Sequence, residues 1–299
     1  MKKRVMVVMA IVAGACMAML TGCGKPALGG GGRISSAYNH SDQYQMGRGS
    51  TEETITKLDL NWISGSVNLV KGSGKEITFS EEANQKLDED TSMYYWIDGE
   101  TLHIQYCREG EIFLSGNLQK DLTITVPEGC HLEECYVDTV SANVYGDSII
   151  AQEFRIDTVS GTTELTACVA EDLVKVSSTS GSVNISLAED TRDITIDTVS
   201  GNSTIQVPYM DDFTVDTTSG DVELVTDKAP EDVDADTISG KVTLDLPPEL
   251  SAVISFDTIS GEFHSDLPGR IDGDDYVFGN GRNSYEINTV SGDFAIVKR

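Results

Sequence analysis

Asp197-Thr198-Val199-Ser200-Gly201 is one of a series of five-residue segments that recur through the second half of the chain. Close copies occupy residues 157–161, 216–220, 236–240 and 257–261, and looser copies occupy 138–142, 177–181 and 288–292. Counted at their last residue, the copies from 142 to 261 follow one another at intervals of 19 to 21 residues, and the final interval is 31. A fixed period of about 20 residues predicts a stack of similar coils.

The residues around each segment alternate between apolar and polar. In the coil that ends at Gly220, Phe213 and Val215 flank Thr214, and Val222 and Leu224 follow the glycine. Such alternation is typical of strands with one buried face. Two short strands cannot bury that face alone, but stacked copies can. We therefore predict an all-β fold, a parallel β-solenoid of about 20-residue coils with an irregular β-rich N-terminal cap.

The first 23 residues have the pattern of a bacterial lipoprotein signal. A basic start (Lys2, Lys3, Arg4) precedes an apolar run and the sequence Leu20-Thr21-Gly22-Cys23. We expect residues 1–22 to be removed and Cys23 to carry a lipid that holds the protein in the cell envelope, outside the cytoplasm. The other interpretation is an uncleaved anchor helix, for which the apolar run is short.

Three further regions are expected after the signal. Residues 23–53 contain the lipidated Cys and a flexible tether, because this stretch is poor in apolar residues. Residues 54–130 form the cap and first coils, with a hairpin at Asp98-Gly99. Residues 131–299 form the solenoid repeats, closed by a C-terminal rung after a Gly- and Asp-rich insert.

The formal net charge is −28. This charge argues against nucleic acid and against anionic membrane surfaces as partners. It is compatible with cations, with basic partners or with solubility alone. Apart from the membrane that holds the lipid, we expect a monomer whose partner is an envelope protein or a glycan.

The repeat places aspartates and glycines in fixed positions. The aspartates would form one column in the stack, either as caps of the turns through Asx-type hydrogen bonds or as ligands of cations; the turn is favoured because Ser177 and Asn288 take the same position. The column comprises Asp138, Asp157, Asp197, Asp216, Asp236 and Asp257. The glycines are expected to form structural corners, where a tight turn needs a positive φ. They are Gly161, Gly181, Gly201, Gly220, Gly240, Gly261 and Gly292.

Nothing in the sequence predicts a catalytic residue, a metal site or a cofactor. The Thr and Ser of each segment are interpreted as inward hydroxyl ladders, and the four histidines are too dispersed to predict a Ser-His-Asp triad or a zinc site. Aspartate and glutamate are too abundant for paired carboxylates to indicate a glycosidase. Cys135 belongs to an apolar column and is expected to be a free core thiol, whereas Cys107 and Cys130 are candidates for a disulfide.

The repeated segment, the early Ser64-Gly65-Ser66-Val67 corner, the hairpin at Asp98-Gly99, the stretch 120–127 and the closing segment 289–294 together resemble a bacterial family labelled "putative adhesin". The resemblance covers about residues 54–299 and implies a β-solenoid on envelope proteins. Ala142 and Ser177 depart from the repeat. The leading hypothesis is a lipid-anchored, non-enzymatic, adhesin-like or envelope-associated interaction module. The alternative is a carbohydrate-active β-helix enzyme, a polysaccharide lyase or hydrolase, which rests on analogy of fold.

Overall fold

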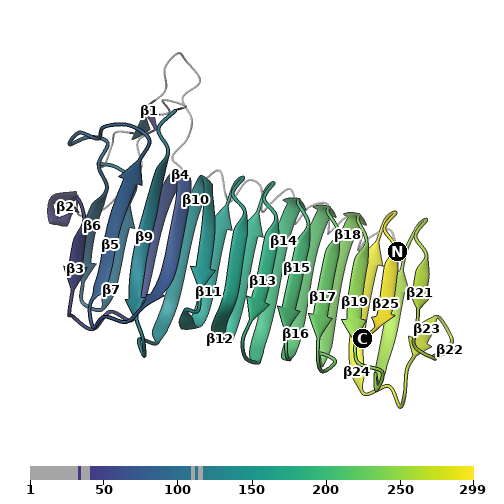
Figure 1. Cartoon of the computed structure of the whole chain (residues 1–299). Coiled ribbons are helices and arrows are strands. Elements are labelled where there is room, and N and C mark those ends of the chain that lie inside the picture. Colours follow the sequence, from purple (N-terminus) through teal and green to yellow (C-terminus); the bar gives the residue numbers. More distant parts are fainter. Residues whose placement is uncertain (1–32, 35–40, 109–111, 114–116) are drawn as a thin grey trace.

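The computed structural model describes residues 33–34, 41–108, 112–113 and 117–299. Within them the chain forms an elongated stack of strands that run across its long axis (Figure 1). The predicted all-β parallel solenoid is confirmed. The predicted signal peptide 1–22 and Cys23 lie outside the described residues.

Each regular coil has two strands joined by the repeated segment. β14 (Thr191–Ser200) runs into a corner and β15 (Ser203–Val207) leaves it, and the next coil repeats this arrangement with β16 (Met210–Ser219) and β17 (Val222–Thr226). β14 pairs in parallel with β16, and β15 pairs in parallel with β17. The strands before the corners therefore form one sheet, here sheet A, and those after the corners form sheet B.

Both sheets extend along the whole stack, and three long strands contribute to both. Sheet A contains, in spatial order, β2 (Gln45–Met46), β6 (Tyr94–Asp98), β7 (Thr101–Gln105), β4 (Lys57–Gly72), β10 (Leu132–Asp147), β11 (Ile150–Thr158), β12 (Thr163–Ser178), β14, β16, β18 (Asp232–Ser239), β24 (Asn283–Thr289), β20 (Ala252–Asp257), β23 (Asp275–Val277) and β22 (Arg270–Asp272). Sheet B contains β3 (Gly49–Thr51), β5 (Ile77–Ala83), β9 (Lys120–Pro127), parts of β4, β10 and β12, then β13 (Val183–Leu187), β15, β17, β19 (Val242–Leu246), β25 (Phe294–Lys298) and β21 (Phe263–Ser265). Apart from these sheets, β1 (Arg33–Ile34) pairs with β8 (Ile112–Phe113), and a single 3-10 turn covers Ser41–Gln43.

The core lies between the two sheets and consists of ladders of equivalent side chains. Phe154, Val174, Ile194 and Phe213 occupy one ladder and are at most 1% exposed. Their polar neighbours, such as Thr195, point to the outer face of sheet A. The predicted alternation is therefore confirmed, and it places every second residue of each strand in one continuous core.

The first coil is β4, and its neighbour in space is β10. Leu60 lies opposite Val137, and Gly65 lies opposite Ala142, although 77 residues separate each pair in sequence. The intervening residues form the cap, in which β5 pairs antiparallel with β9 and the predicted hairpin joins β6 to β7.

The predicted tether, 23–53, is wrong in its described part. Gln45 and Met46 pair antiparallel with β6, and residues 49–51 pair antiparallel with β5. Thr51 is buried there. The physical reason is that these short strands cover the first edges of both sheets, whose backbone groups would otherwise lack partners.

The prediction of a closing C-terminal rung is also wrong. β24 lies between β18 and β20, and β25 lies between β19 and β21, so the last coil in the sequence is the penultimate coil in space. The physical reason is that β23 pairs antiparallel with β20 and so occupies the outer edge of β20. Figure 1 shows β24 and β25 inside the stack and β21, β22 and β23 at its end.

Candidate functional site

At four corners, the second residue of the repeated segment caps the turn. The hydroxyl oxygen of Thr158 accepts a hydrogen bond from the Gly161 backbone N–H at 2.9 Å, and Ser178 does the same for Gly181. Thr258 and Thr289 cap Gly261 and Gly292 in the same way. These side chains point into the core, as predicted. Hydroxyls of neighbouring coils also bond to one another: Thr139 donates to Thr158 at 2.8 Å, and Thr198 donates to Thr217 at 2.9 Å.

The aspartates do not cap these corners, so that interpretation is wrong. Asp157 immediately precedes the capping Thr158, and the alternation of the strand carries it to the opposite, outer face of sheet A. There its Oδ2 accepts a hydrogen bond from the Tyr136 hydroxyl at 3.2 Å. The sequence could not distinguish the two roles, because Asp and Thr both favour turns.

Glycine is required at the corners because the coils approach one another closely. A Cβ at Gly220 would lie 2.2 Å from the Gly201 carbonyl oxygen, and one at Gly161 would lie 1.8 Å from that of Ala142. Among the predicted corner glycines only Gly201 has a strongly positive φ, at 143°. The predicted structural role is thus supported, but the expected cause, positive φ, is wrong for the others.

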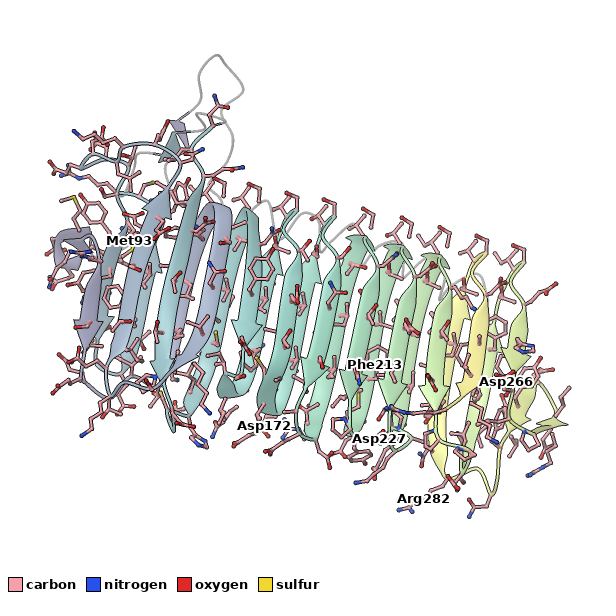
Figure 2. All side chains as sticks on the ribbon, in the orientation of Figure 1. Met93, Asp172, Phe213, Asp227, Asp266 and Arg282 are labelled. Carbon is pink, nitrogen blue, oxygen red and sulfur yellow. The ribbon has the colours of Figure 1, made fainter. Side chains whose placement is uncertain are left out.

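The corner serines form a hydrogen-bond ladder along the surface. Ser160 Oγ donates to the Val140 carbonyl of the preceding coil at 3.3 Å, and its backbone N–H donates to the same oxygen at 3.0 Å. Equivalent bonds to the adjacent coil are made by Ser141, Ser180, Ser200, Ser219, Ser239, Ser260 and Ser291. These serines are exposed or half-buried instead of inward-pointing. Figure 2 shows the repeated corner side chains along the upper edge of the stack.

The aspartate column exists and is in register along sheet A. Asp138 lies opposite Asp157, and Asp216 lies between Asp197 and Asp236. The full order across the sheet is Gln105, Asn61, Asp138, Asp157, Ser177, Asp197, Asp216, Asp236, Asn288 and Asp257. Neighbouring members are therefore about 4.8 Å apart, the spacing of strands in a sheet.

The outer face of sheet A is most acidic around β14, β16 and β18. A second column, four residues earlier in each strand, contains Asp193, Asp212 and Asp232 in register. Together with Asp197, Asp216, Asp234 and Asp236 they form what we call the acidic face. At the border of the acidic face nearest the N-terminus, Lys175 Nζ lies 3.6 Å from Asp197 Oδ2.

This crowding changes the acidity of the column. Burial and the neighbouring carboxylates, first Asp197 and then Asp236, raise the pKa of Asp216 to about 6. At the other end, burial followed by Asp157 and Asp59 raises the pKa of Asp138 to about 6. Desolvation and like charge both favour the neutral acid, so these carboxyls take up protons more readily than exposed aspartates.

Exposed ion pairs lie along the opposite edge of the stack. Arg192 pairs with Asp172 at 3.4 Å, and Arg299 pairs with Asp227 at 3.2 Å. Figure 2 places Asp172 and Asp227 on the lower edge of the stack. These pairs are exposed and therefore contribute little to stability.

The cap holds a buried ion pair that sequence reasoning missed. Lys120 Nζ lies 2.7 Å from Glu81 Oε2, and the two side chains are 0% and 8% exposed. The ammonium also donates to the carbonyls of Thr91 and Tyr106 and lies 4.9 Å from the centre of the Trp62 ring. Burial lowers the pKa of Lys120, and Glu81 opposes that shift. The sequence did contain an indication of this buried lysine. The alternation of β9 places Lys120 on the same inward face as Leu122 and Ile124.

A second feature of the cap is an aromatic group on the outer face. The Trp96 and His103 rings stack at 5.1 Å with an interplanar angle of 20°. His103 Nδ1 lies 2.7 Å from Asp59 Oδ2, and Asp59 also accepts a hydrogen bond from Asn61. The Tyr44 ring lies 5.8 Å from the Trp96 ring and is tilted from it by 58°.

The predicted disulfide between Cys107 and Cys130 does not form. Cys107 follows Gln105, which lies opposite Asn61, whereas Cys130 Sγ contacts the Ile55 carbonyl. Residues 55 and 61 are six steps apart, which corresponds to about 20 Å of extended chain, far beyond the reach of a disulfide. Cys135 is a fully buried free thiol, as predicted.

Within residues 41–108 and 117–299, no three His, Cys, Asp or Glu side chains converge on a point that could hold a metal ion. In the part of the chain that the structure describes, there is also no helix with the length and hydropathy needed to cross a membrane.

Comparisons with known proteins place the chain in a family. No curated protein matches it significantly. Among solved structures, similarity was found to a "putative cell adhesion protein" from Clostridium sporogenes (15% identity, 85% of this chain and 100% of the other, TM-score 0.26). Similarity was also found to a "putative adhesin" from Bacteroides fragilis (11% identity, covering 85% of this chain and 97% of the other, TM-score 0.46). The model of the Toastrack DUF4097 family matches residues 55–297. The coils, the cap and this match agree, and the chain belongs to the Toastrack DUF4097 family.

Proposed function

We propose that this protein is a lipid-anchored, non-enzymatic interaction module that is displayed outside the cytoplasmic membrane and binds an envelope protein or a glycan. The proposal has two parts. Cys23 provides the anchor, and the outer face of the solenoid provides the binding surface.

The observation that carries the proposal is how the repeat uses its polar groups. The threonines cap corners and bond to one another, and the serines bond to the preceding coil. The corner serines are thus hydrogen-bonded to the scaffold, and a serine held in this way is not oriented as a nucleophile. The aspartates of sheet A follow the strand spacing in straight columns, and among the residues that the structure describes no three carboxylates converge on a point that could hold a metal ion.

Such a surface is suited to extended partners. The column on sheet A passes through ten in-register positions from β7 to β20. Gln105 and Ser177 are buried, but the other members of the column are open to a basic or hydroxyl-rich polymer, whose weak contacts would add along its length.

The anchor rests on the sequence alone. The segment 20–23 follows an apolar run and a basic start, in the order that lipoprotein signals have. We expect mass spectrometry of the mature protein to find Cys23 at the N-terminus with a lipid attached. Cys23→Ser should leave the chain unprocessed or release it from the membrane fraction, and an unmodified N-terminus elsewhere would contradict the anchor.

Binding can be tested with intact envelopes and two matched variants. The first variant replaces Asp197, Asp216 and Asp236 by Asn, which removes charge from the acidic face. The control replaces Glu164 and Glu223, exposed on sheet B, by Gln. We expect weaker envelope binding for the first variant alone. Equal loss in both variants would contradict a role for sheet A, and release of soluble sugar from purified envelope polysaccharide would favour the enzyme instead.

A further inference from the structure

The C-terminal coil fills a gap between two coils that precede it in the sequence. Ile287 in β24 lies between Ala235 in β18 and Phe256 in β20. Phe294 in β25 has Val242 on one side and Phe263 on the other. Residues 283–298 therefore occupy a slot with a parallel strand edge on each wall, in both sheets.

The slot is apolar and closely fitted to this coil. Tyr285, Ile287, Phe294 and Ile296 are all at most 1% exposed. The Phe294 ring stacks on Phe263 at 5.1 Å with an interplanar angle of 15°. An empty slot would expose these walls and leave both strand edges without hydrogen-bond partners, at a high cost in free energy.

The hinge that leads into this coil is short. Phe278 is fixed to Ala252 by two backbone hydrogen bonds of 2.8 and 3.1 Å, and β24 begins at Asn283. Of the four residues between them, Gly279 and Gly281 have φ of +55° and +68°. Short hinge loops that need an unusual backbone conformation favour exchange of the following element between copies.

We propose that the C-terminal coil, residues 283–298, is an exchangeable element that can occupy the slot of a second copy of this chain, to give a reciprocally swapped dimer. The second copy is the occupant because its coil has the same sequence and makes the same contacts. An extended hinge of four residues reaches about 14 Å, so the two solenoids would meet at their C-terminal ends. The closed monomer is favoured in dilute solution, because the tethered coil has a high effective concentration at its own slot.

The test uses full-length chains that carry one added cysteine each. One chain has Asp236→Cys and the other has Asn288→Cys, because these positions are register neighbours across the slot wall. The two are mixed at high concentration, warmed briefly, cooled and treated with a short bifunctional thiol reagent. A chain with both substitutions should cross-link internally, which verifies that the reagent spans the wall.

We expect an interchain product that maps to positions 236 and 288. A control mixture of Asp197→Cys with Asn288→Cys should give none, because three strand spacings, about 14 Å, separate these positions. Gly279→Val disfavours the closed hinge, because position 279 has a positive φ and a Cβ there would lie 3.0 Å from the Leu250 carbonyl oxygen. This substitution should raise the yield of the interchain 236–288 product several-fold. The proposal would be overturned if the interchain product were absent both with Gly279 and with Gly279→Val, or if the control mixture gave an equal yield.

Discussion

Asp216→Asn should stabilise the protein at neutral pH, because the aspartate column is crowded with like charge. Asp216 is half-buried between Asp197 and Asp236, and its pKa is raised from 3.8 to about 6. A hydrogen bond from protonated Asp216 to Asp197 also contributes to this higher pKa. An Asn at position 216 keeps a donor toward Asp197, as the protonated acid would, and removes the repulsion.

The magnitude follows from linkage. A difference of roughly two units between the pKa of Asp216 in the folded and unfolded states corresponds to about 3 kcal/mol in the free energy of unfolding. Solvent screening at a half-buried site reduces this to about 1.5 kcal/mol, or about 3–6 °C in Tm for a chain of this length. Because the folded-state pKa is the higher one, the stabilising contribution of the neutral acid is complete below about 3.8 and is lost as the pH rises through about 6.

The assay is thermal unfolding of wild type and variants between pH 4 and pH 7.5. Wild type should become more stable as the pH falls from 7.5 toward 5, and the gain from Asp216→Asn should be present at pH 7.5 and absent at pH 4. Asp274→Asn, at an exposed loop position, is the control and should be neutral at both. Millimolar Ca²⁺ or EDTA should leave the Tm of wild type unchanged. A variant no more stable than wild type at pH 7.5, or a gain that persists at pH 4, would refute the electrostatic account.

Three further predictions concern the scaffold, each measured by chemical denaturation. Gly220→Ala should cost at least 3 kcal/mol because its Cβ would lie 2.2 Å from the Gly201 carbonyl, whereas Gly74→Ala, with nothing closer than 3.9 Å, should be nearly neutral; equal effects would contradict the close-approach argument. Lys120→Met should cost about 3–5 kcal/mol by leaving Glu81 buried without its partner, and the double variant with Glu81→Leu should recover part of that loss. Thr217→Val should cost about 1–3 kcal/mol, since Thr198 loses its buried acceptor, while Thr214→Val on the outer face should change little.

The sequence determined the repeated architecture by itself. The 20-residue period and the alternation around Phe213 and Val215 were sufficient to predict coils of two strands with one buried face, because a strand has only two faces and only one of them is apolar. The register of the aspartate column follows from the same period, since equivalent residues of stacked coils must lie side by side.

Only the tertiary structure decided which polar group performs which task. Asp157 and Thr158 are adjacent turn-forming residues, and the direction of the pleat alone makes Thr158 the cap and sends Asp157 to the surface. The requirement for glycine at position 220 likewise depends on the distance between coils, which no local propensity encodes. The buried partner of Lys120 comes from β5, 39 residues earlier in the chain.

The order of the last coils was also beyond the sequence. The repeat at 288–292 is compatible with any free strand edge, and each coil has the same complementary edges. The antiparallel strand at 275–277 takes the outer edge of β20, so the last coil must enter the remaining position between β18 and β20. Local pattern therefore specified what each coil is, and competition for backbone hydrogen-bond partners specified where the last one lies.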